Sequence, residues 1–186
     1  MNLLKNKKFL TIALGIFIAL IMVSSVLNIT SSNNQSRVKY KSYSFTKTDN
    51  GWLLFKDNTK YLLSFNPVEL ENVEVPNLNF NQLNFLEKIY ISINPEENTR
   101  STIAEFQRNI RLTPTLVTSC FIDVTQCSDL PLKTCNDTTS SIGVIIFKES
   151  NESEISFNNN CLTISGSIIE STKAVDKLVL KSLGVM

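Results

Sequence analysis

The sequence predicts an α/β fold, with α+β as the alternative, in which one apolar N-terminal helix precedes a small domain. Three observations predict it: an uncharged apolar run near the N-terminus, short β-rich runs between turn residues in the first half, and alternating strand and helix patterns in the second half. The composition agrees, because 42% hydrophobic and 19% charged residues are typical of a folded chain. The length leaves room for one independent core.

The first 27 residues have the charge pattern of a signal-anchor. Residues 1–8 carry three lysines and no acid, and residues 9–27 carry no charge at all. At ~1.5 Å per residue this uncharged run is long enough for a ~30 Å hydrocarbon layer. We therefore expect Phe9–Leu27 to cross the lipid bilayer of the cell membrane once, with residues 1–8 cytoplasmic and the C-terminal domain extracytoplasmic. The alternative is a signal peptide cleaved near Ser25, which would give a secreted protein.

The next segments are a tether and a β-meander. Residues 28–39 are mostly polar and predict a flexible tether. Within residues 40–85, we expect three strands up to Phe65, with turns at Asp49-Asn50-Gly51 and Asp57-Asn58-Thr59. The Asn-rich stretch that follows, residues 68–84, predicts irregular structure.

Residues 86–186 predict a small mixed-sheet domain. A strand at 86–93 leads to a helix that we expect to begin at Asn94-Pro95, with acids in its first turn and apolar residues at helical spacing. A strand at 116–122 completes a βαβ unit. A strand at 142–147 and a hairpin follow, and the predicted hairpin strands are residues 155–157 and 161–164.

The closing helix should begin with a capping box at Ser167–Glu170 and end at Gly184. The resulting order, β-α-β-β-β-α, is also that of a thioredoxin-like core.

All four cysteines lie in the part predicted to be extracytoplasmic, and their spacings do not match zinc sites. We therefore expect a disulfide framework, as in proteins on the oxidising side of a membrane. Three pairings are open. The prediction is Cys127–Cys135, which closes a short Pro-containing loop, with Cys120–Cys161, because both of these residues lie at the ends of strands that could be neighbours in one sheet.

The sequence offers little catalytic equipment. It contains no histidine, which removes the commonest general base and the commonest metal ligand, and no Cys-x-x-Cys pair. A formal net charge of +1 excludes the basic surface that nucleic acid requires. We expect a non-enzymatic binding or envelope-structural module without a cofactor. The alternatives are an exported thiol–disulfide protein with a thioredoxin-like core, and a hydrolase that uses Ser/Lys or Asp/Glu chemistry.

Four Asn-x-Ser/Thr sequons are present, at Asn28, Asn34, Asn136 and Asn151, a number expected by chance in a chain this rich in Asn, Ser and Thr. If the cell glycosylates exported proteins, Asn136 and Asn151 in polar loops are the predicted acceptors.

Three stretches carry a resemblance to known sequences: residues 88–95, residues 130–135, and the C-terminal run from Val175 to Met186. In these the chain resembles uncharacterised membrane-anchored proteins of archaeal type that have a Cys-containing extracytoplasmic domain. The resemblance implies no activity and assigns no functional residue.

Overall fold

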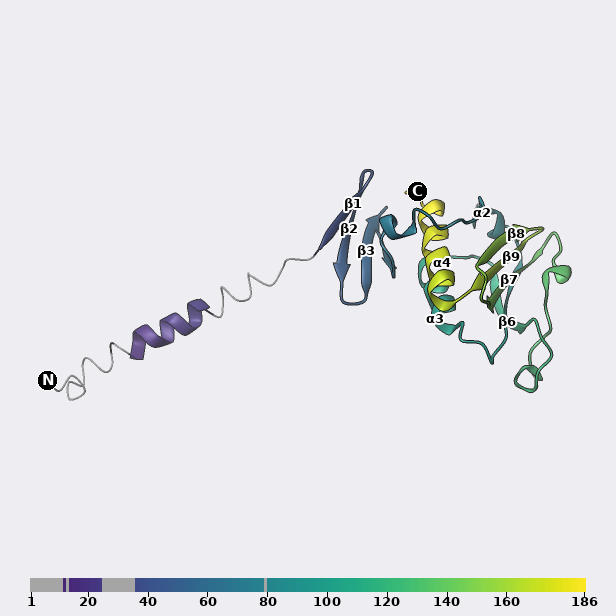
Figure 1. The fold of residues 1–186 in the computed structure, drawn as a ribbon, viewed down its shortest axis with the longest axis horizontal. Coiled ribbons are helices and arrows are strands. Elements are labelled where there is room, and N and C mark those ends of the chain that lie inside the picture. The colour runs from purple at the N-terminus through teal and green to yellow at the C-terminus, as the bar shows by residue number, and fades with distance from the viewer. Residues whose placement is uncertain (1–11, 13, 25–35, 79) are drawn as a thin grey trace. The chain divides into compact units, whose positions relative to one another are not determined.

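The computed structural model describes residues 12, 14–24, 36–78 and 80–186, and it divides the chain into two units, Met1–Ser36 and Arg37–Met186. In the first unit residues 12 and 14–24 are helical (Figure 1). The large apolar side chains of this helix are all about half exposed or more, from Ile18 at 48% to Met22 at 66%. Within the described residues, no helix combines the length and the apolar character that a membrane crossing requires. Residues 1–8 and most of the predicted tether lie outside the described residues.

The second unit begins with a four-stranded antiparallel sheet in the order β1-β2-β3-β4. Its strands are β1 (Arg37–Tyr40), β2 (Tyr43–Thr48), β3 (Gly51–Lys56) and β4 (Thr59–Leu63). The prediction of three strands and of a tether reaching residue 39 was therefore wrong. The missed turn is Lys41-Ser42, where Lys41 has a φ of 51° although the pair contains no Gly, Asn or Asp to mark a turn.

The segment predicted to be irregular contains two short helices, η2 (Pro67–Leu70) and α2 (Phe80–Leu83). Asn66 caps η2 in a reciprocal capping box with Glu69. Residues 67–78 then run as a strap beside the C-terminal helix, held by ammonium groups that donate to strap carbonyls: Lys177 to Leu70 and Glu71, and Lys181 to Val75 and Pro76.

The second sheet has five strands in the order β6-β5-β7-β9-β8. They are β5 (Lys88–Ile93), β6 (Thr115–Cys120), β7 (Ile142–Glu149), β8 (Glu154–Asn158) and β9 (Cys161–Gly166). All neighbours run parallel except β8, which pairs antiparallel with β9. The predicted α/β class is confirmed. The element order of this part is β-α-β-β-β-β-α, one strand more than the predicted β-α-β-β-β-α.

The two longer helices are α3 (Arg100–Asn109) and α4 (Ile168–Ser182). The predicted start of α3 at Asn94 was wrong. Glu97 does not lie in the first turn of a helix. Its carboxylate accepts hydrogen bonds from the side-chain amide of Asn94 and from the backbone N–H of Glu149, and so connects the loop after β5 to the end of β7. Helix α4 begins with the predicted Ser167–Glu170 capping box, and Gly184 follows its end with a φ of 66°.

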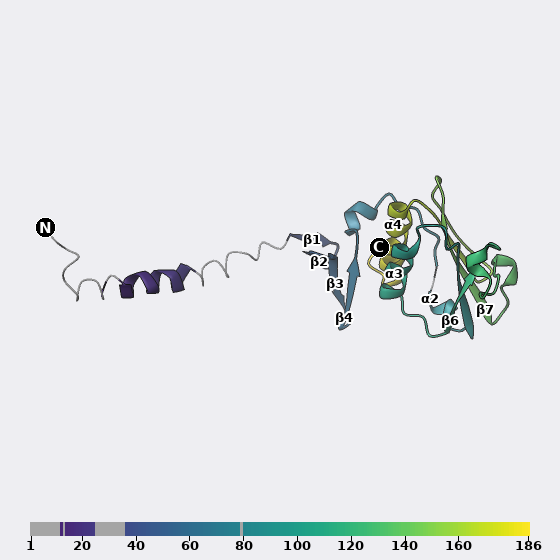
Figure 2. The ribbon, with the colours of Figure 1, turned by 90° about the horizontal axis from the view of Figure 1, so that it is seen from below.

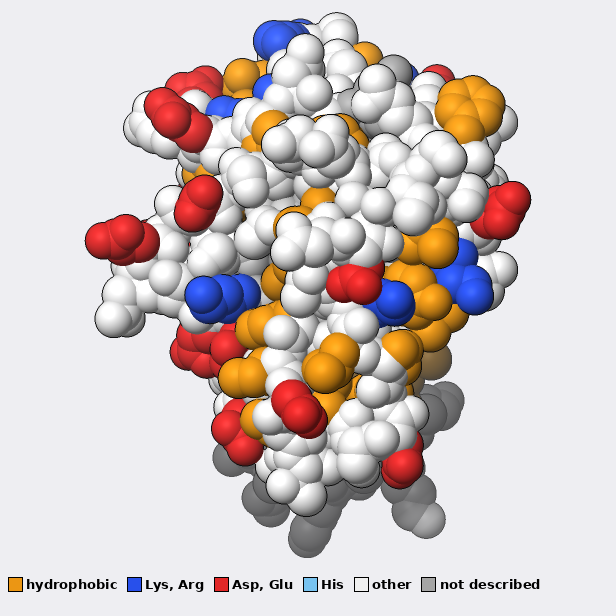
Figure 3. Space-filling model, turned by 90° about the vertical axis from the view of Figure 1, so that its right-hand side faces the viewer, with side chains coloured by type: hydrophobic (Ala, Val, Ile, Leu, Met, Phe, Trp, Pro, Cys, Tyr) orange, Lys and Arg blue, Asp and Glu red, His pale blue; other side chains and the backbone are white. Residues whose placement is uncertain are grey.

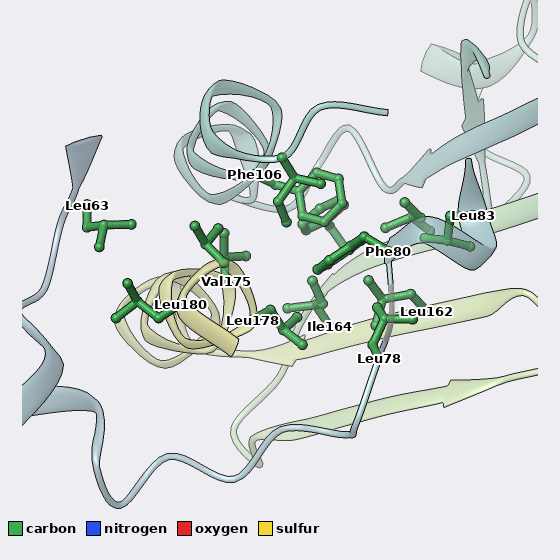
Figure 4. Close-up of a cluster of buried hydrophobic side chains, with 14 of the residues drawn as sticks. Leu63, Leu78, Phe80, Leu83, Phe106, Leu162, Ile164, Val175, Leu178 and Leu180 are labelled. Carbon is green, nitrogen blue, oxygen red and sulfur yellow. The ribbon is translucent and has the colours of Figure 1, made fainter. Parts of the chain in front are cut away.

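Helices α3 and α4 lie between the two sheets (Figures 1 and 2). Their facing surfaces, together with both sheets, form one hydrophobic core (Figure 4). At its centre the ring of Phe106 meets those of Phe80 and Phe147 edge to face, at centroid distances of 6.1 and 5.6 Å. Residues 121–141 connect β6 to β7, and we call them the cystine loop. They contact the opposite face of the five-stranded sheet at Tyr90 and Ser92 of β5, through Lys133.

Candidate functional site

The four cysteines form two cystines at the cystine loop, Cys120–Cys127 and Cys135–Cys161, with Cα–Cα distances of 6.1 and 5.3 Å. The disulfide framework that the sequence predicted is present, but the predicted pairing, Cys127–Cys135 with Cys120–Cys161, was wrong. Strands β6 and β9, which carry Cys120 and Cys161, are not neighbours, because β5 and β7 lie between them.

The path of the cystine loop explains the observed pairing. Directly after β6 the chain turns through η3 (Thr125–Cys127), which returns Cys127 to the end of the strand. Residues 131–133 then run beside Cys120, which donates its N–H to Pro131 and accepts the N–H of Lys133. From there the chain crosses the sheet face, where the Ser92 hydroxyl donates to the Lys133 carbonyl at 2.6 Å. Cys135 consequently arrives at β9 rather than at Cys127.

The two cystines differ in their access to solvent. Cys120, Cys127 and Cys161 are 0%, 3% and 4% exposed, whereas Cys135 is exposed. Cys135 also lines an open hollow of about 520 Å³, whose other lining residues are Asn136, Thr138, Thr139, Ser140, Asn159 and Asn160. One cystine is thus enclosed, and the other can be approached from one side.

Short-range polar contacts set the conformation around Cys135. Thr134 caps η4 (Cys135–Asp137), and its backbone N–H and hydroxyl both donate to the Asp137 carboxylate. These hydrogen bonds, with a smaller contribution from Lys133, hold the pKa of Asp137 below its usual range. The Lys133 ammonium also lies over the Tyr90 ring, 5.3 Å from its centroid. The segment that carries Cys135 is therefore held by its own contacts as well as by the cystine.

The two predicted glycosylation acceptors lie apart. Asn136 is exposed and lines the same hollow as Cys135, whereas Asn151 is exposed in the turn between β7 and β8. Asn28 and Asn34 lie outside the described residues.

A second polar cluster, which was not predicted from the sequence, joins the helices to the free edge of β4. The Asn109 side chain of α3 accepts a hydrogen bond from the N–H of Leu62 and donates one to the Leu62 carbonyl. It thus pairs with the two backbone groups that a further strand beside β4 would use. Next to it the Ser64 hydroxyl donates to Glu105, which is only 5% exposed and also pairs with Arg108.

Asp176 of α4 completes this cluster. It is fully buried, its Oδ2 accepts the N–H of Phe65 at 2.9 Å, and its Oδ1 has no hydrogen-bond partner within the described part of the chain. Burial, and then the nearby charge of Glu105, raise the pKa of Asp176 to about 9. Asp176 is therefore protonated at neutral pH. The available signal was an acid placed among the apolar residues Val175, Leu178 and Val179 of a helix.

An open groove of about 770 Å³ lies between the strap, the start of β8 and the first turns of α4. Four glutamates and Lys173 are among its lining residues. Glu69 and Glu170 are the acids of two capping boxes, and the Lys173 ammonium lies over the Phe65 ring. These three charged side chains already have structural roles within the fold.

Within the described residues, no group of three or more Cys, Asp or Glu side chains is arranged to hold a metal ion. Of the buried carboxyl groups, Asp176 accepts the backbone N–H of Phe65, and Glu105 interacts with the side chains of Ser64, Arg108 and Asn109. The cystines of the loop are capable of thiol–disulfide exchange. Neither cystine has the two-residue spacing of a Cys-x-x-Cys pair, since the sequence separations are 7 and 26.

Fold and site together define a small two-sheet α/β domain stapled by two cystines. The chain matches no protein-family model, no curated protein and no solved structure.

Proposed function

We propose that the protein is a single-pass membrane-anchored domain on the extracytoplasmic side of the cell membrane, where it acts as a non-enzymatic binding or envelope-structural module. The observation that carries this proposal is the pairing of all four cysteines in two cystines. Cystines persist in oxidising compartments and are rare in the reducing cytosol. Both cystines hold the connection from β6 to β7, so the domain is suited to the extracytoplasmic side of the membrane.

The N-terminal segment supports the anchor. The helical residues 14–23 include Ile16, Phe17 and Ile18, three consecutive side chains that point in different directions around the helix, and each is about half exposed or more. A helix that is apolar on all sides is stable only in apolar surroundings. The lysines of residues 1–8 favour retention of that end in the cytoplasm.

Two features support a module rather than an enzyme. The chain has no histidine for acid–base work at neutral pH. The perturbed carboxyl group, Asp176, is fully buried between a helix and the Phe65 backbone, where a substrate has no access. We infer that this group serves the fold.

The topology can be tested with single introduced thiols, because all four native cysteines are paired. Asp49→Cys places a thiol in the exposed turn between β2 and β3, and Asn6→Cys places one before the apolar segment. In intact cells a membrane-impermeant maleimide should label Asp49→Cys, and it should label Asn6→Cys only after lysis. The reverse pattern would overturn the proposal. Protein found in the medium would support the cleaved, secreted form.

The module role can be tested by photo-crosslinking in intact cells. Phe85, Phe55 and Ile169 are 87%, 59% and 59% exposed and lie after α2, on β3 and in the first turn of α4. A photoreactive phenylalanine analogue at each position should give a discrete adduct from one position and not from the others. Absence of an adduct from all three positions would contradict a binding role.

A further inference from the structure

We propose that Cys135–Cys161 is a reducible bond that exchanges with small thiols or dithiols, while Cys120–Cys127 is a permanent staple of the cystine loop. This inference goes beyond the module role and requires only that both cystines form. It follows from three observations: the access to one sulfur, the nature of the space in front of it, and the contacts that remain when the bond opens.

Access is the first observation. Thiol–disulfide exchange requires a thiolate to reach one sulfur of the bond, and its rate depends on which sulfur is accessible. Both residues of Cys120–Cys127 are buried, at 0% and 3% exposure. In the other cystine Cys161 is buried on β9, but Cys135 is exposed. Attack on the native fold is therefore directed to the Cys135 sulfur.

The space in front of Cys135 is the second observation. Its hollow of about 520 Å³ is large enough for a small thiol, and its lining consists of Asn, Thr and Ser side chains besides Cys135 itself. No carboxylate is among these lining residues. The nearby Asp137 carboxylate accepts hydrogen bonds from the Thr134 N–H and the Lys133 ammonium, which offset its charge. The Thr163 hydroxyl lies 3.7 Å from the Cys135 sulfur.

Exchange with a small thiol opens the Cys135–Cys161 bond in one displacement step. A thiolate bonds to the Cys135 sulfur, the Cys135–Cys161 bond breaks, and its electron pair leaves on the Cys161 sulfur, which takes a proton from water. With a dithiol, the second thiol then loses its proton and displaces Cys135 as a thiolate, which is protonated in turn. The dithiol is oxidised to a disulfide, and the cystine gains two electrons and two protons.

The contacts that remain are the third observation. Residues up to Lys133 stay attached through Cys120–Cys127 and through the hydrogen bonds of Cys120 with Pro131 and Lys133. Beyond Thr134, the hydrogen bond from the Asn160 amide to the Thr139 carbonyl still links the loop to the β8–β9 turn. Reduction should consequently release residues 134–138 from β9 without unfolding the domain.

Tryptic mapping of the full-length chain in detergent tests this inference. Cleavage after Arg111, Lys133, Lys148 and Lys173 leaves Cys120 and Cys127 in one peptide but places Cys135 and Cys161 in two different peptides. The native protein is treated with graded reduced glutathione or dithiothreitol, blocked with N-ethylmaleimide and digested without further reduction. The linked pair 134–148 and 149–173 should disappear about tenfold faster than the internal cystine of 112–133.

Loss of both cystines at the same rate would overturn the inference, because it would mean that reduction requires unfolding. Faster loss of Cys120–Cys127 would overturn it as well.

A matched pair of variants separates local access from general stability. Ser140 is exposed and lines the hollow, so Ser140→Glu and Ser140→Lys change its charge with little effect on the core. Relative to wild type, Ser140→Glu should slow reduction of Cys135–Cys161 by anionic glutathione about threefold, and Ser140→Lys should accelerate it by a similar factor. Equal rates in both variants would show that thiols do not enter through this hollow.

Discussion

At the scale of single residues, Asp176 has the most unusual environment in the domain. It is fully buried, one of its oxygens accepts a backbone N–H, and the other has no partner within the described residues. Desolvation disfavours a charge at this position, and the charge of Glu105 adds to that effect. The folded domain therefore binds a proton that the unfolded chain releases.

The sign of the pH dependence follows from this difference. The pKa of Asp176 is about 9 in the folded state and 3.8 without the fold, so its contribution to stability is complete below the lower value and is lost as the pH rises towards the higher one. We expect the free energy of unfolding to fall between pH 5 and pH 8, by up to about 1.4 kcal/mol per pH unit from this group.

Urea unfolding of wild type and Asp176→Asn at both pH values checks the prediction. Asparagine imitates the neutral acid and carries no titrating proton, so the variant should lose most of the slope. Asp49→Asn, a change in an exposed turn, should retain it. An unchanged slope in Asp176→Asn would assign the pH dependence to other groups.

Gly51 is a second residue with a specific conformational role. Its φ is 137°, and a Cβ there would lie 2.3 Å from the carbonyl oxygen of Leu63 on the neighbouring strand. Gly51→Ala should therefore combine backbone strain with displacement of β4, at a cost of about 3 kcal/mol. Gly184 is the matched control, because its φ of 66° is also left-handed but no atom lies within 4 Å of the added carbon.

Gly184→Ala should cost only about 1 kcal/mol. Thermal unfolding of both variants distinguishes the two contributions, and equal losses would show that contact with β4 has no role.

At the scale of elements, the edge of β4 depends on helix side chains rather than on another strand. Asn109 satisfies both the N–H and the carbonyl of Leu62. Asn109→Ala removes the acceptor of the Leu62 N–H, whereas the Leu62 carbonyl keeps the hydrogen bond from Arg108. The variant should lower the free energy of unfolding by about 2 kcal/mol. Asn151→Ala, at an exposed turn position, should change it by less than about 0.5 kcal/mol.

Amide hydrogen exchange gives a local readout for the same variant. The amide of Leu62 should exchange faster in Asn109→Ala, while amides of β9 change only with global stability. Unchanged protection of Leu62 would mean that another group supplies its partner.

Most elements could be predicted because their signals are local. The helical spacing of Phe106 and Ile110 and the Ser167–Glu170 capping box depend on neighbours within a turn or two of the chain, and both appear in the fold. The start of α3 could not be predicted in this way. The acid at Glu97 resembles a first-turn residue, but its partner is the backbone of Glu149, 52 positions away.

At the scale of the whole molecule, the two cystines close loops of different length. In the loop-closure description of a cross-link, sequence separations of 7 and 26 correspond to about 2.5 and about 3.5 kcal/mol. The longer loop is closed by the bond between Cys135, in the second half of the cystine loop, and Cys161 on β9. We expect Cys135–Cys161 to contribute more to global stability even though it is the easier bond to reduce.

Two double variants isolate these contributions. With Cys120 and Cys127 both changed to Ala, only Cys135–Cys161 can form, and with Cys135 and Cys161 changed to Ala, only Cys120–Cys127 can. Comparing the oxidised and reduced forms of each variant in urea holds all side chains constant. Reduction should cost the first variant more than the second, and the opposite order would contradict the loop-length argument.

The sequence by itself determined the features that depend on short-range chemistry: the α/β class, the capped closing helix, the uncharged apolar run and the formation of cystines. Tertiary structure alone decided which cysteines pair and where Glu105, Asn109 and Asp176 meet. The physical reason is that pairing and buried polar contacts depend on strand order, which places β5 and β7 between β6 and β9, and on helix packing against the edge of β4. The contacts of Asn109 with Leu62 and of Asp176 with Phe65 join positions 47 and 111 apart in the sequence, and no local pattern records them.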